Sequence, residues 1–411
     1  LRWLTAALVG LGAERVQLLL LVLWAGQGMS SSAMRLALIG PVYPYRGGIA
    51  HYTTRLAQAI RQRGHDLLLV SFSRQYPQWL FPGKSDKDSS QKPIEAGEAQ
   101  YWIDSINPLT WLSTFWRIRS FRPDGIILQW WTTYWALAWF LLMALFHGFL
   151  HCPVIVICHN VLPHEARWWD PWLVRLVLRW GALLTTQSAE EREKLLGLLP
   201  GAHVEICPHP VYDFLSDQQT SRETARSQLS LPAGVPILLC FGVVRPYKGL
   251  RDLLMALPAV RAELAQVLLV VAGEFWEDKQ SYSELVRQLG VEESVLIDDR
   301  YIPNEEVALL FSAADLLVAP YREVTGSGSV QMARGLGLPV VTTRVGDMAE
   351  AVRGQAALLV PPADPEALAA GIIHHFTSNP EAAPPVAPGG DSFTWDQLVT
   401  IIETAVRGDA A

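Results

Sequence analysis

The chain contains 411 residues, of which 50% are hydrophobic and 18% are charged, and its formal net charge at pH 7 is −7. A chain of this length is too long for one ordinary core, so we expect two domains. The composition excludes a disordered chain, and the acidic balance, with a pI of about 5.8, gives no support to a nucleic-acid partner. The four cysteines lack metal-ligand spacing, and we interpret them as reduced core residues of a cytosolic protein.

Residues 1–33 differ in character from the rest of the chain. Residues 18–24 are apolar, but charged residues just before them leave the run too short to span a bilayer. Ala25 and Gly26 offer a weak cleavage site for a signal peptide. We therefore interpret residues 1–33 as an N-terminal extension of uncertain status, and we expect the folded protein to begin at Met34.

Strand-length apolar runs alternate with amphipathic helical patterns in the first half of the chain. We expect strands at residues 35–40, 66–72, 124–129, 153–158, 182–186 and 204–208. We expect helices at residues 49–63, 108–119 and 130–150. Residues 73–100 are typical of a surface excursion, and residues 212–228, which are polar and lack a strand pattern, are expected to connect two domains.

Residues 130–150 contain no Asp, Glu, Lys or Arg and are long enough for a transmembrane helix. A buried strand pattern resumes directly afterwards, however, and strands of one sheet cannot lie on opposite sides of a membrane. We therefore interpret the segment as a crossover helix that is either buried all round or laid partly against lipid. Tryptophans gather at its start and again beside the arginines of residues 167–180, which suits a membrane interface, although core packing explains them equally well.

The alternation restarts in the second half of the chain. We expect strands at residues 237–241, 267–272, 295–297, 315–319, 339–343 and 357–360. We expect helices at residues 251–264, 282–289, 304–313, 330–336, 365–376 and 395–406. This pattern predicts an α/β protein with two doubly wound Rossmann-like domains that face each other across a cleft.

Two glycine-containing turns lie where strands end and helices begin. Residues 325–329 (TGSGS) follow a strand and would offer backbone N–H groups and hydroxyls to phosphate oxygens at a helix N-terminus. Gly47 and Gly48 open the first predicted helix in the same way. Small residues that merely make a tight turn are the alternative. The three-glycine dinucleotide pattern is absent, which argues against a Rossmann dehydrogenase.

Taken in order, these stretches resemble the GT-B glycosyltransferases, specifically glycosyltransferase family 4. The landmarks are GGIAHYTT, FGVVRPYKGL, VAGE, AADLLVAPYRE, the GSGS turn and GLPVVTTRVGDMAEAV, and the likeness runs from Met34 to about residue 405. The resemblance implies an acceptor-binding domain at residues 34–210, a linker at 211–230, a nucleotide-sugar-binding domain at 231–390, and a helix within 391–411 that returns to the first domain. It also implies catalysis without a metal or other cofactor, the nucleotide-sugar being a substrate.

The resemblance extends to single residues that would hold the donor phosphates. Arg245 and Lys248 resemble the basic pair that holds the donor pyrophosphate in this family, where two cations would stabilise the charge on the leaving group. Surface charges after a strand are the alternative reading. The turn residues Ser327, Gly328 and Ser329 would hold the same phosphates, and Gly47 and Gly48 would approach the donor phosphate and the acceptor.

Other positions would contact the rest of the donor. Glu323 resembles an acidic residue that contacts the donor sugar or ribose, and His159 resembles a histidine near the transferred sugar, although it could equally cap a neighbouring strand. Tyr301 and Ile302 fall where the nucleotide base usually rests, and Gly273 and Glu274 form the VAGE landmark beside it.

Two departures from the family pattern weaken any statement about which sugar is bound. Met332 or Gln331 stands where the family often has a second glutamate. The basic pair is commonly five residues apart, whereas Arg245 and Lys248 are three apart.

The sequence therefore predicts a retaining, metal-independent glycosyltransferase of the hexosyl-transferring kind. Its donor would be a nucleotide-diphosphate sugar, and its acceptor a lipid-linked or polysaccharide-precursor saccharide. We expect a cytoplasmic location, with peripheral contact at the inner face of the membrane through the aromatic first domain. The alternatives are a sugar-nucleotide epimerase or phosphorylase on the same fold, and a non-catalytic sugar-nucleotide-binding protein.

Overall fold

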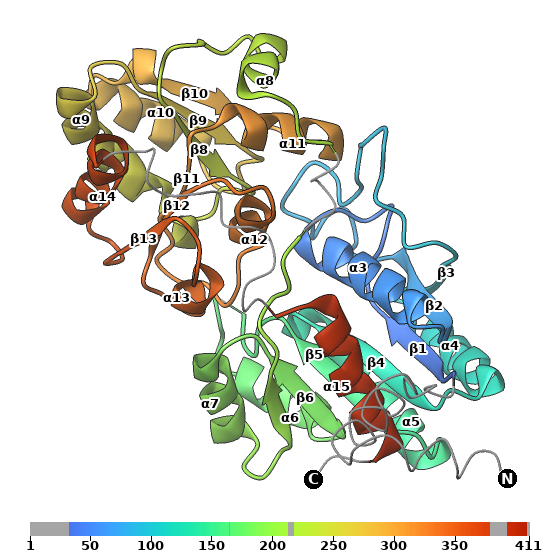
Figure 1. Ribbon diagram of the computed structural model, residues 1–411. Helices are drawn as coiled ribbons and strands as arrows, with labels where there is room; N and C mark the ends of the chain where they lie inside the picture. Colours follow the sequence, from blue (N-terminus) through green and yellow to red (C-terminus); the bar gives the residue numbers. More distant parts are fainter. Residues whose placement is uncertain (1–32, 164, 213–217, 379–392, 409–411) are drawn as a thin grey trace, which may run out of the picture. The chain divides into compact units, whose positions relative to one another are not determined.

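The computed structural model describes residues 33–163, 165–212, 218–378 and 393–408 (Figure 1). Residues 1–32 of the predicted extension and the Pro/Ala/Gly-rich stretch at 380–390 lie outside the described residues. Residues 1–34 and 35–411 are separate compact units, and the description below concerns the second unit.

The first half of this unit is built on a sheet of seven parallel strands in the order β3-β2-β1-β4-β5-β6-β7. The strands are β1 (Arg35–Ile39), β2 (Asp66–Arg74), β3 (Gln100–Asp104), β4 (Gly125–Trp130), β5 (Val154–Cys158), β6 (Leu183–Thr186) and β7 (Val204–Ile206). The helices are α3 (Gly48–Gln62), α4 (Pro108–Phe121), α5 (Ala136–Phe149), α6 (Asp170–Leu178) and α7 (Ala189–Leu198), with a 3-10 turn η1 (Thr133–Trp135). Strands β4 and β5 are buried along their whole length, as expected of central parallel strands covered on both faces.

The second half is built on six parallel strands in the order β10-β9-β8-β11-β12-β13. The strands are β8 (Ile237–Phe241), β9 (Leu268–Ala272), β10 (Val295–Asp298), β11 (Leu316–Ala319), β12 (Val340–Thr343) and β13 (Ala357–Val360). The helices are α8 (Arg222–Gln228), α9 (Leu250–Glu263), α10 (Lys279–Gln288), α11 (Asn304–Ala313), α12 (Gly328–Gly335), α13 (Met348–Ala351) and α14 (Pro365–Thr377), with 3-10 turns η3 (Pro246–Lys248) and η4 (Glu292–Ser294).

Each sheet has one point at which the strand order reverses. The reversal lies between β1 and β4 in the first sheet and between β8 and β11 in the second. Ligands of open α/β sheets bind outside the carboxyl ends of the strands at such a point. The glycine turns at Gly47–Gly48 and at 325–329 follow β1 and β11, so both predicted loops lie at a reversal.

The apolar segment at residues 130–150 is confirmed as a crossover. Strand β4 ends at Trp130, α5 follows, and β5 returns parallel to β4. Trp130, Trp135 and Trp139 are at most 1% exposed and belong to the core of the first sheet. Within the described residues, we find no helix with the length and apolar character needed to cross a membrane.

β3, α6, α7, α8 and α13 lie outside the predicted elements. Strand β3 lies at the edge of the first sheet and pairs with β2 in an irregular register, and its residues do not form a continuous buried run. Helix α8 falls inside the predicted connection at residues 212–228, and it is polar because it buries few side chains. One of these is Arg226, which donates to the carbonyl oxygen of Ala313 at 2.9 Å and pairs with Asp315 at 2.6 Å.

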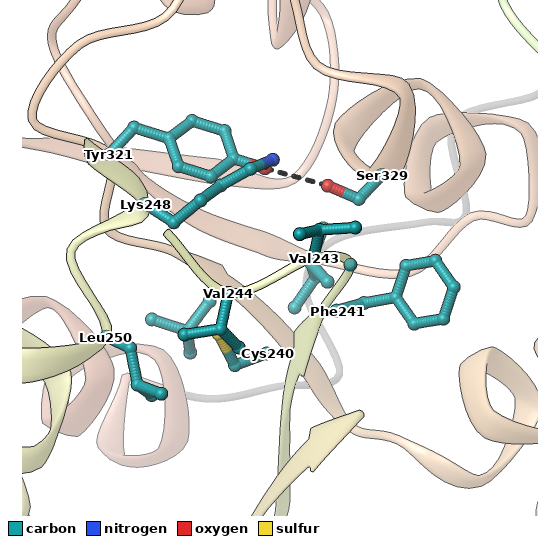
Figure 2. Close-up of a pocket in the computed structure, with 11 residues that line it drawn as sticks. Cys240, Phe241, Val243, Val244, Lys248, Leu250, Tyr321 and Ser329 are labelled. Atoms are coloured by element: carbon teal, nitrogen blue, oxygen red, sulfur yellow. Dashed lines mark hydrogen bonds between the residues drawn. The ribbon is translucent and has the colours of Figure 1, made fainter. Parts of the chain in front are cut away.

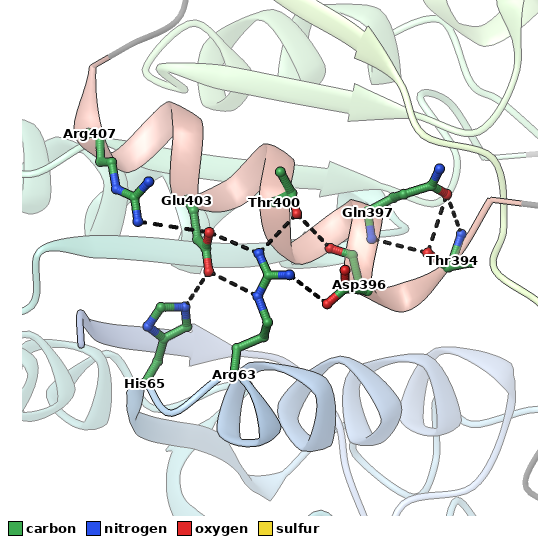
Figure 3. Close-up of polar contacts among 8 residues, drawn as sticks. All are labelled: Arg63, His65, Thr394, Asp396, Gln397, Thr400, Glu403 and Arg407. Carbon is green, nitrogen blue, oxygen red and sulfur yellow. Dashed lines mark hydrogen bonds and ion pairs between the residues drawn. The ribbon is translucent and has the colours of Figure 1, made fainter. Parts of the chain in front are cut away.

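The last helix, α15 (Trp395–Arg407), packs against α3 of the first half, as Figure 3 shows. Arg63, at the end of α3, donates to Asp396 at 2.6 Å and to Glu403 at 3.0 and 3.2 Å. His65 Nε2 lies 2.7 Å from Glu403 Oε1. Apolar side chains of α15 are buried at the same interface, so both charge pairing and apolar packing hold this helix on the first half.

Candidate functional site

Two loops at the reversal of the second sheet are held in close contact. One follows β8 and contains η3, and the other follows β11 and leads into α12. Gly249 has φ +72°, and a Cβ at this position would stand 1.8 Å from the carbonyl oxygen of Pro320, so only glycine fits. Arg322 adds a bidentate pair with Asp252, at 2.8 and 2.7 Å. These contacts hold the loop that contains Lys248 against the loop after β11.

A cluster of hydroxyl groups and one ammonium group forms where these loops meet. Tyr321 Oη lies 2.8 Å from both Ser327 Oγ and Ser329 Oγ, and Lys248 Nζ donates to Tyr321 Oη at 3.4 Å. Ser327 also caps α12, because its Oγ accepts from the N–H of Val330 at 3.3 Å. We call Lys248, Tyr321, Ser327 and Ser329 the serine–lysine cluster.

The serine–lysine cluster carries positive charge that no carboxylate neutralises. Burial opposes the charged form of Lys248, but the neighbouring hydroxyls of Tyr321 and Tyr247 outweigh that effect and raise the pKa of the ammonium group above its usual value. The guanidinium carbon of Arg245 lies 4.5 Å from the centre of the Trp276 ring, a cation–π contact. No ion pair between described residues includes Arg245 or Lys248. Lys248 and the hydroxyl groups beside the N-terminus of α12 form a site for an anion.

A narrow pocket opens beside the cluster (Figure 2). Its floor is apolar and comes from the end of β8 and the residues that follow it. Lys248, Tyr321 and Ser329 line its polar side, and Figure 2 shows the hydroxyl of Tyr321 turned towards Ser329. The pocket therefore places apolar surface next to the anion-binding groups.

Gly273 packs within the second half, whereas Glu274 joins the two halves of the molecule. Gly273 has φ +153°, and a Cβ there would stand 2.1 Å from the carbonyl oxygen of Gly242. The carboxylate of Glu274 pairs with Arg46 and accepts from the N–H of Lys84 at 2.8 Å. Burial raises the pKa of Glu274, but these donors and Trp276 hold the pKa below its usual value. Glu274 is thus an ionised carboxylate committed to contacts within the protein.

Tyr301 and Ile302 lie where residues 85–91 of the first half contact the second half. The guanidinium of Arg46 lies 5.1 Å from the centre of the Tyr301 ring. Burial and Asp88 raise the pKa of Tyr301. Ile302 is 5% exposed and belongs to the core, so of the two residues Tyr301 offers the more accessible surface.

Gly47 and Gly48 lie at the reversal of the first sheet and are exposed. Gly47 has φ +107°, and a Cβ on either glycine would meet no atom within 4 Å. The carbonyl oxygen of Gly48 accepts from the hydroxyl of Tyr212 at 3.2 Å. Tyr212 is fully buried, and its ring lies at the start of α12, 3.5 Å from the point where a Cβ on Gly328 would stand.

His159 lies at the end of β5 in a network of neutral groups. Its Nε2 is 2.6 Å from Gln129 Oε1, and its Nδ1 is 3.4 Å from Gln187 Nε2. Since an amide Nε2 can only donate, His159 Nδ1 accepts and Nε2 carries the hydrogen. Burial, with His209 nearby, lowers the pKa of His159 to about 3. His159 is therefore an uncharged imidazole at neutral pH, with both nitrogens hydrogen-bonded.

Glu323 stands apart from these groups. Its side chain is exposed, and it forms no ion pair with a described residue, whereas its neighbour Arg322 is held by Asp252. Among the described residues, Glu323 is therefore a surface carboxylate without an ion pair, on the loop after β11.

Several residues of the site were not singled out from the sequence. Tyr321 joins the serines to Lys248, Arg46 pairs with Glu274, and the hydroxyl of Thr325 donates to Asn160 Oδ1 of the first half. The position of Tyr321 directly after Pro320, at the end of a strand, is the one local signal available. The partners of Arg46 and Thr325 are far away in the chain, and no local pattern indicates them.

Two family models match the chain. The model "Glycosyl transferase 4-like domain" matches residues 47–211, which hold most of the first sheet. The model "Glycosyl transferases group 1" matches residues 235–378, which hold the whole second sheet. The two matches are consecutive and together span both halves of the described unit.

One curated relative is the D-inositol 3-phosphate glycosyltransferase 1 of Catenulispora acidiphila. It is 30% identical over 244 residues, which make up 55% of this chain and 58% of that protein. The chain spans about half the length of the curated relatives it matches.

Two solved structures share the fold over nearly the whole chain. The Anabaena protein HepE, in complex with UDP-glucose, superposes with a TM-score of 0.68 at 17% identity and covers 92% of this chain and 99% of its own. Sucrose-phosphate synthase from Thermosynechococcus elongatus superposes with a TM-score of 0.65 at 19% identity, covering 91% and 98%. At these identities the likeness establishes the arrangement of strands and helices, and the chemistry of the site has to be argued from its own residues.

Proposed function

Since this chain belongs to the group 1 glycosyltransferases and has their GT-B fold, as its sequence predicts, we propose that it transfers a sugar from a nucleoside-diphosphate sugar to a hydroxyl acceptor. The carrying observation is the serine–lysine cluster, in which an unneutralised ammonium group adjoins two hydroxyls and a helix N-terminus. A diphosphate fits this set of groups because its oxygens accept from all of them. The curated relative and the UDP-glucose-bound Anabaena protein support the same substrate class.

In the proposed reaction, Lys248 and Arg245 stabilise the leaving diphosphate. The bond between the anomeric carbon and the phosphate oxygen breaks, and its electron pair remains on the diphosphate. The acceptor hydroxyl bonds to the same carbon, and its proton passes to the departing phosphate. Cations aimed at charge that grows in the transition state accelerate such a step. Attack from the face of the departing group would retain the anomeric configuration, and the two cations supply positive charge without requiring a metal ion.

His159 supports this step as an uncharged positioning group. Its nitrogens are hydrogen-bonded to Gln129 and Gln187, and its low pKa makes it a poor proton acceptor at neutral pH. Glu323, exposed at the edge of the donor loop, is free to contact the sugar or ribose, and Tyr301 is the surface on which the base would rest. Gly47 and Gly48 leave space for the acceptor at the first reversal.

Calorimetric titration with UDP, GDP and ADP, each with and without magnesium, tests the donor site. We expect one diphosphate to bind without magnesium, and Lys248→Ala or Arg245→Ala to weaken that binding about 10- to 100-fold, as loss of a charge-assisted hydrogen bond implies. Arg353→Ala is the matched control, because Arg353 is an exposed cation of the same half that pairs with Glu350. Failure of all three diphosphates to bind would overturn the proposal, as would unchanged binding by both variants.

We further propose that the acceptor is lipid-linked and that the protein contacts an anionic membrane surface through α6. Trp168 and Trp172 are 86% and 61% exposed, unlike the buried tryptophans around α5. Arg175 and Arg179 are exposed on the same helix or directly after it. Exposed tryptophan beside arginine matches an interface that is both apolar and negatively charged.

Vesicle co-sedimentation tests this contact. We expect binding to vesicles that contain phosphatidylglycerol, weaker binding to pure phosphatidylcholine, and about tenfold weaker binding by a Trp168→Ala/Trp172→Ala double variant. Trp79→Ala is the control, because Trp79 is 82% exposed but lies between β2 and β3, whereas Trp168 and Trp172 lie just before and on α6. An equal loss in the control variant, or no binding by the unchanged protein, would refute the membrane contact.

A non-catalytic sugar-nucleotide-binding protein is the rival that a specific observation favours. Gln331, a candidate for the position of the family's second glutamate, is 2% exposed on α12, and its Oε1 has no hydrogen-bond partner among the described residues. An amide there would bind a hydroxyl without supplying negative charge. This rival would be favoured if the protein binds the donor but neither transfers its sugar nor slowly hydrolyses it. An epimerase or a phosphorylase would instead convert the donor without a sugar acceptor.

A further inference from the structure

The turn after β12 packs directly against the loop that carries the serine–lysine cluster. Gly346 has φ +52°, and a Cβ there would stand 1.8 Å from the carbonyl oxygen of Val324. This close approach places the next residue, Asp347, beside the turn at residues 325–329. Asp347 precedes α13, but its side chain makes no capping hydrogen bond to that helix. Its carboxyl group is therefore not explained by helix capping.

The carboxyl group of Asp347 is buried and incompletely paired. The residue is 5% exposed, and its Oδ1 is buried without a hydrogen-bond partner among the described residues. Its Oδ2 lies 3.6 Å from the point where a Cβ on Gly326 would stand. Burial of an unpaired polar atom costs stability, and a ligand group that hydrogen-bonds to Oδ1 would offset this cost.

Gln187 approaches Gly326 from the first half. Its Oε1 lies 2.2 Å from the same Cβ point, so a side chain on residue 326 would collide with it. The adjoining residue Thr325 donates to Asn160, which fixes this part of the turn at the end of β5. Asp347 and Gln187 thus converge on a single glycine of the turn, and Gln187 links that point to His159.

The surroundings of Asp347 suit a neutral ligand group. Burial, with Glu350 nearby, raises the pKa of Asp347 to about 8, and no described cation pairs with it. A carboxyl group that keeps its proton can both donate and accept a hydrogen bond. A sugar hydroxyl does the same, whereas a phosphate would be drawn to the cationic cluster.

We propose that Asp347 is a specificity-determining residue that hydrogen-bonds to a hydroxyl of the donor sugar beside Gly326. The inference rests on the proposed function, since it deepens the donor site from its diphosphate to its sugar. In this arrangement the serine–lysine cluster binds the diphosphate, which all donors of one nucleotide share, and Asp347 recognises the sugar attached to it. Selection of the sugar then depends on a residue eighteen positions beyond Ser329 in the chain.

Paired calorimetric titrations test the role of Asp347. Each free diphosphate is compared with its sugar conjugate: UDP with UDP-glucose and UDP-galactose, GDP with GDP-mannose, and ADP with ADP-glucose. For the pair that the unchanged protein binds, we expect Asp347→Ala to weaken sugar-conjugate binding about tenfold, with diphosphate binding unchanged within about twofold. We expect Asp347→Asn, which keeps a donor and an acceptor, to retain most of the conjugate affinity. Glu366→Ala, which removes an exposed carboxylate on α14, is the control.

Thermal unfolding separates this role from a structural one. Removal of a buried carboxyl group that is only partly hydrogen-bonded should leave the melting temperature of Asp347→Ala unchanged or higher, whereas removal of a structural residue would lower it. If the alanine variant does not fold, Asp347→Leu takes its place, because leucine fills the site without a hydrogen-bonding group and should weaken conjugate binding by about the same factor. Equal losses for diphosphate and conjugate, or no loss for either, overturn it. If the unchanged protein binds no diphosphate, the proposed function fails and this inference fails with it.

Discussion

The two reversal points of the sheets differ in how tightly they are built. At the second, Gly249 is pressed against Pro320, and Tyr321 holds two serines and Lys248 in one hydrogen-bonded cluster. At the first, Gly47 and Gly48 are exposed, and the space beside them is empty to 4 Å. A crowded, pre-organised site suits a ligand group that never changes, and an open one suits a larger and more variable ligand. The comparison therefore matches a donor diphosphate on one side and an acceptor on the other.

The strongest test of this difference is to replace one glycine by alanine at each reversal point. Gly249→Ala should destabilise the protein by about 3 kcal/mol or more, because the new Cβ collides with the backbone of Pro320 at positive φ. Gly48→Ala should leave stability unchanged or raise it by up to about 1 kcal/mol, because Gly48 begins α3 and its surroundings are open. Urea unfolding measures both changes. Similar losses in the two variants would contradict the difference between the points.

The first half also receives support from the end of the chain, and this support should depend on pH. Burial raises the pKa of Glu403, but hydrogen bonds from Arg63 and His65 outweigh burial and hold the pKa below its usual value. The ionised form therefore stabilises the fold above a pH of about 4.3, the ordinary pKa of glutamate, and this contribution is lost as the pH falls through the lowered pKa. Glu403→Gln should cost about 1–2 kcal/mol at pH 7.

Urea unfolding from pH 7 to pH 3 checks the Glu403 prediction. The difference in stability between Glu403→Gln and the unchanged protein should shrink towards the acid end of this range. Glu366→Gln, on α14 of the second half, is a control without a described ion pair to Arg or Lys. A difference that stays constant with pH would show that the charge of Glu403 contributes nothing.

The smallest expected effect concerns a single hydroxyl of the tightly built site. Tyr321→Phe keeps the ring but removes the oxygen that joins Ser327, Ser329 and Lys248. Diphosphate binding should weaken about fivefold, because the serines and Lys248 remain but lose their common partner. Tyr247→Phe is the comparison, since it removes a hydroxyl near the same lysine but not in the cluster. Equal effects would mean that Tyr321 has no special organising role.

The parts of the site that could be predicted from sequence are those whose chemistry is local. Ser327–Ser329 follow a strand end, so the order of elements indicated a ligand-binding turn there, whereas Arg245 and Lys248 were assigned from the family resemblance. Tyr321, Arg46 and Asp347 act through partners far away in the chain, and nothing adjacent to them signals this. The tryptophans show the same limit: Trp139 and Trp172 look alike in sequence, yet the first is buried under the sheet and the second is exposed on α6. Their burial depends on strand register and crossover geometry, which the local composition does not indicate. Edge strand β3 was missed because it has no continuous apolar run.

The contacts of Tyr212 set a rule for recombining this protein with its relatives. The hydroxyl of this residue donates to the carbonyl oxygen of Gly48 in the first turn of α3. Its own backbone carbonyl oxygen lies 1.9 Å from the point where a Cβ on Gly335, at the end of α12, would stand. A chimera joined after residue 212 would therefore pair one parent's tyrosine with the other parent's α12, and any side chain larger than glycine at position 335 would clash. A junction placed before residue 211 would keep Tyr212 with its own α12 and leave only the hydrogen bond to Gly48 to be matched across the new boundary.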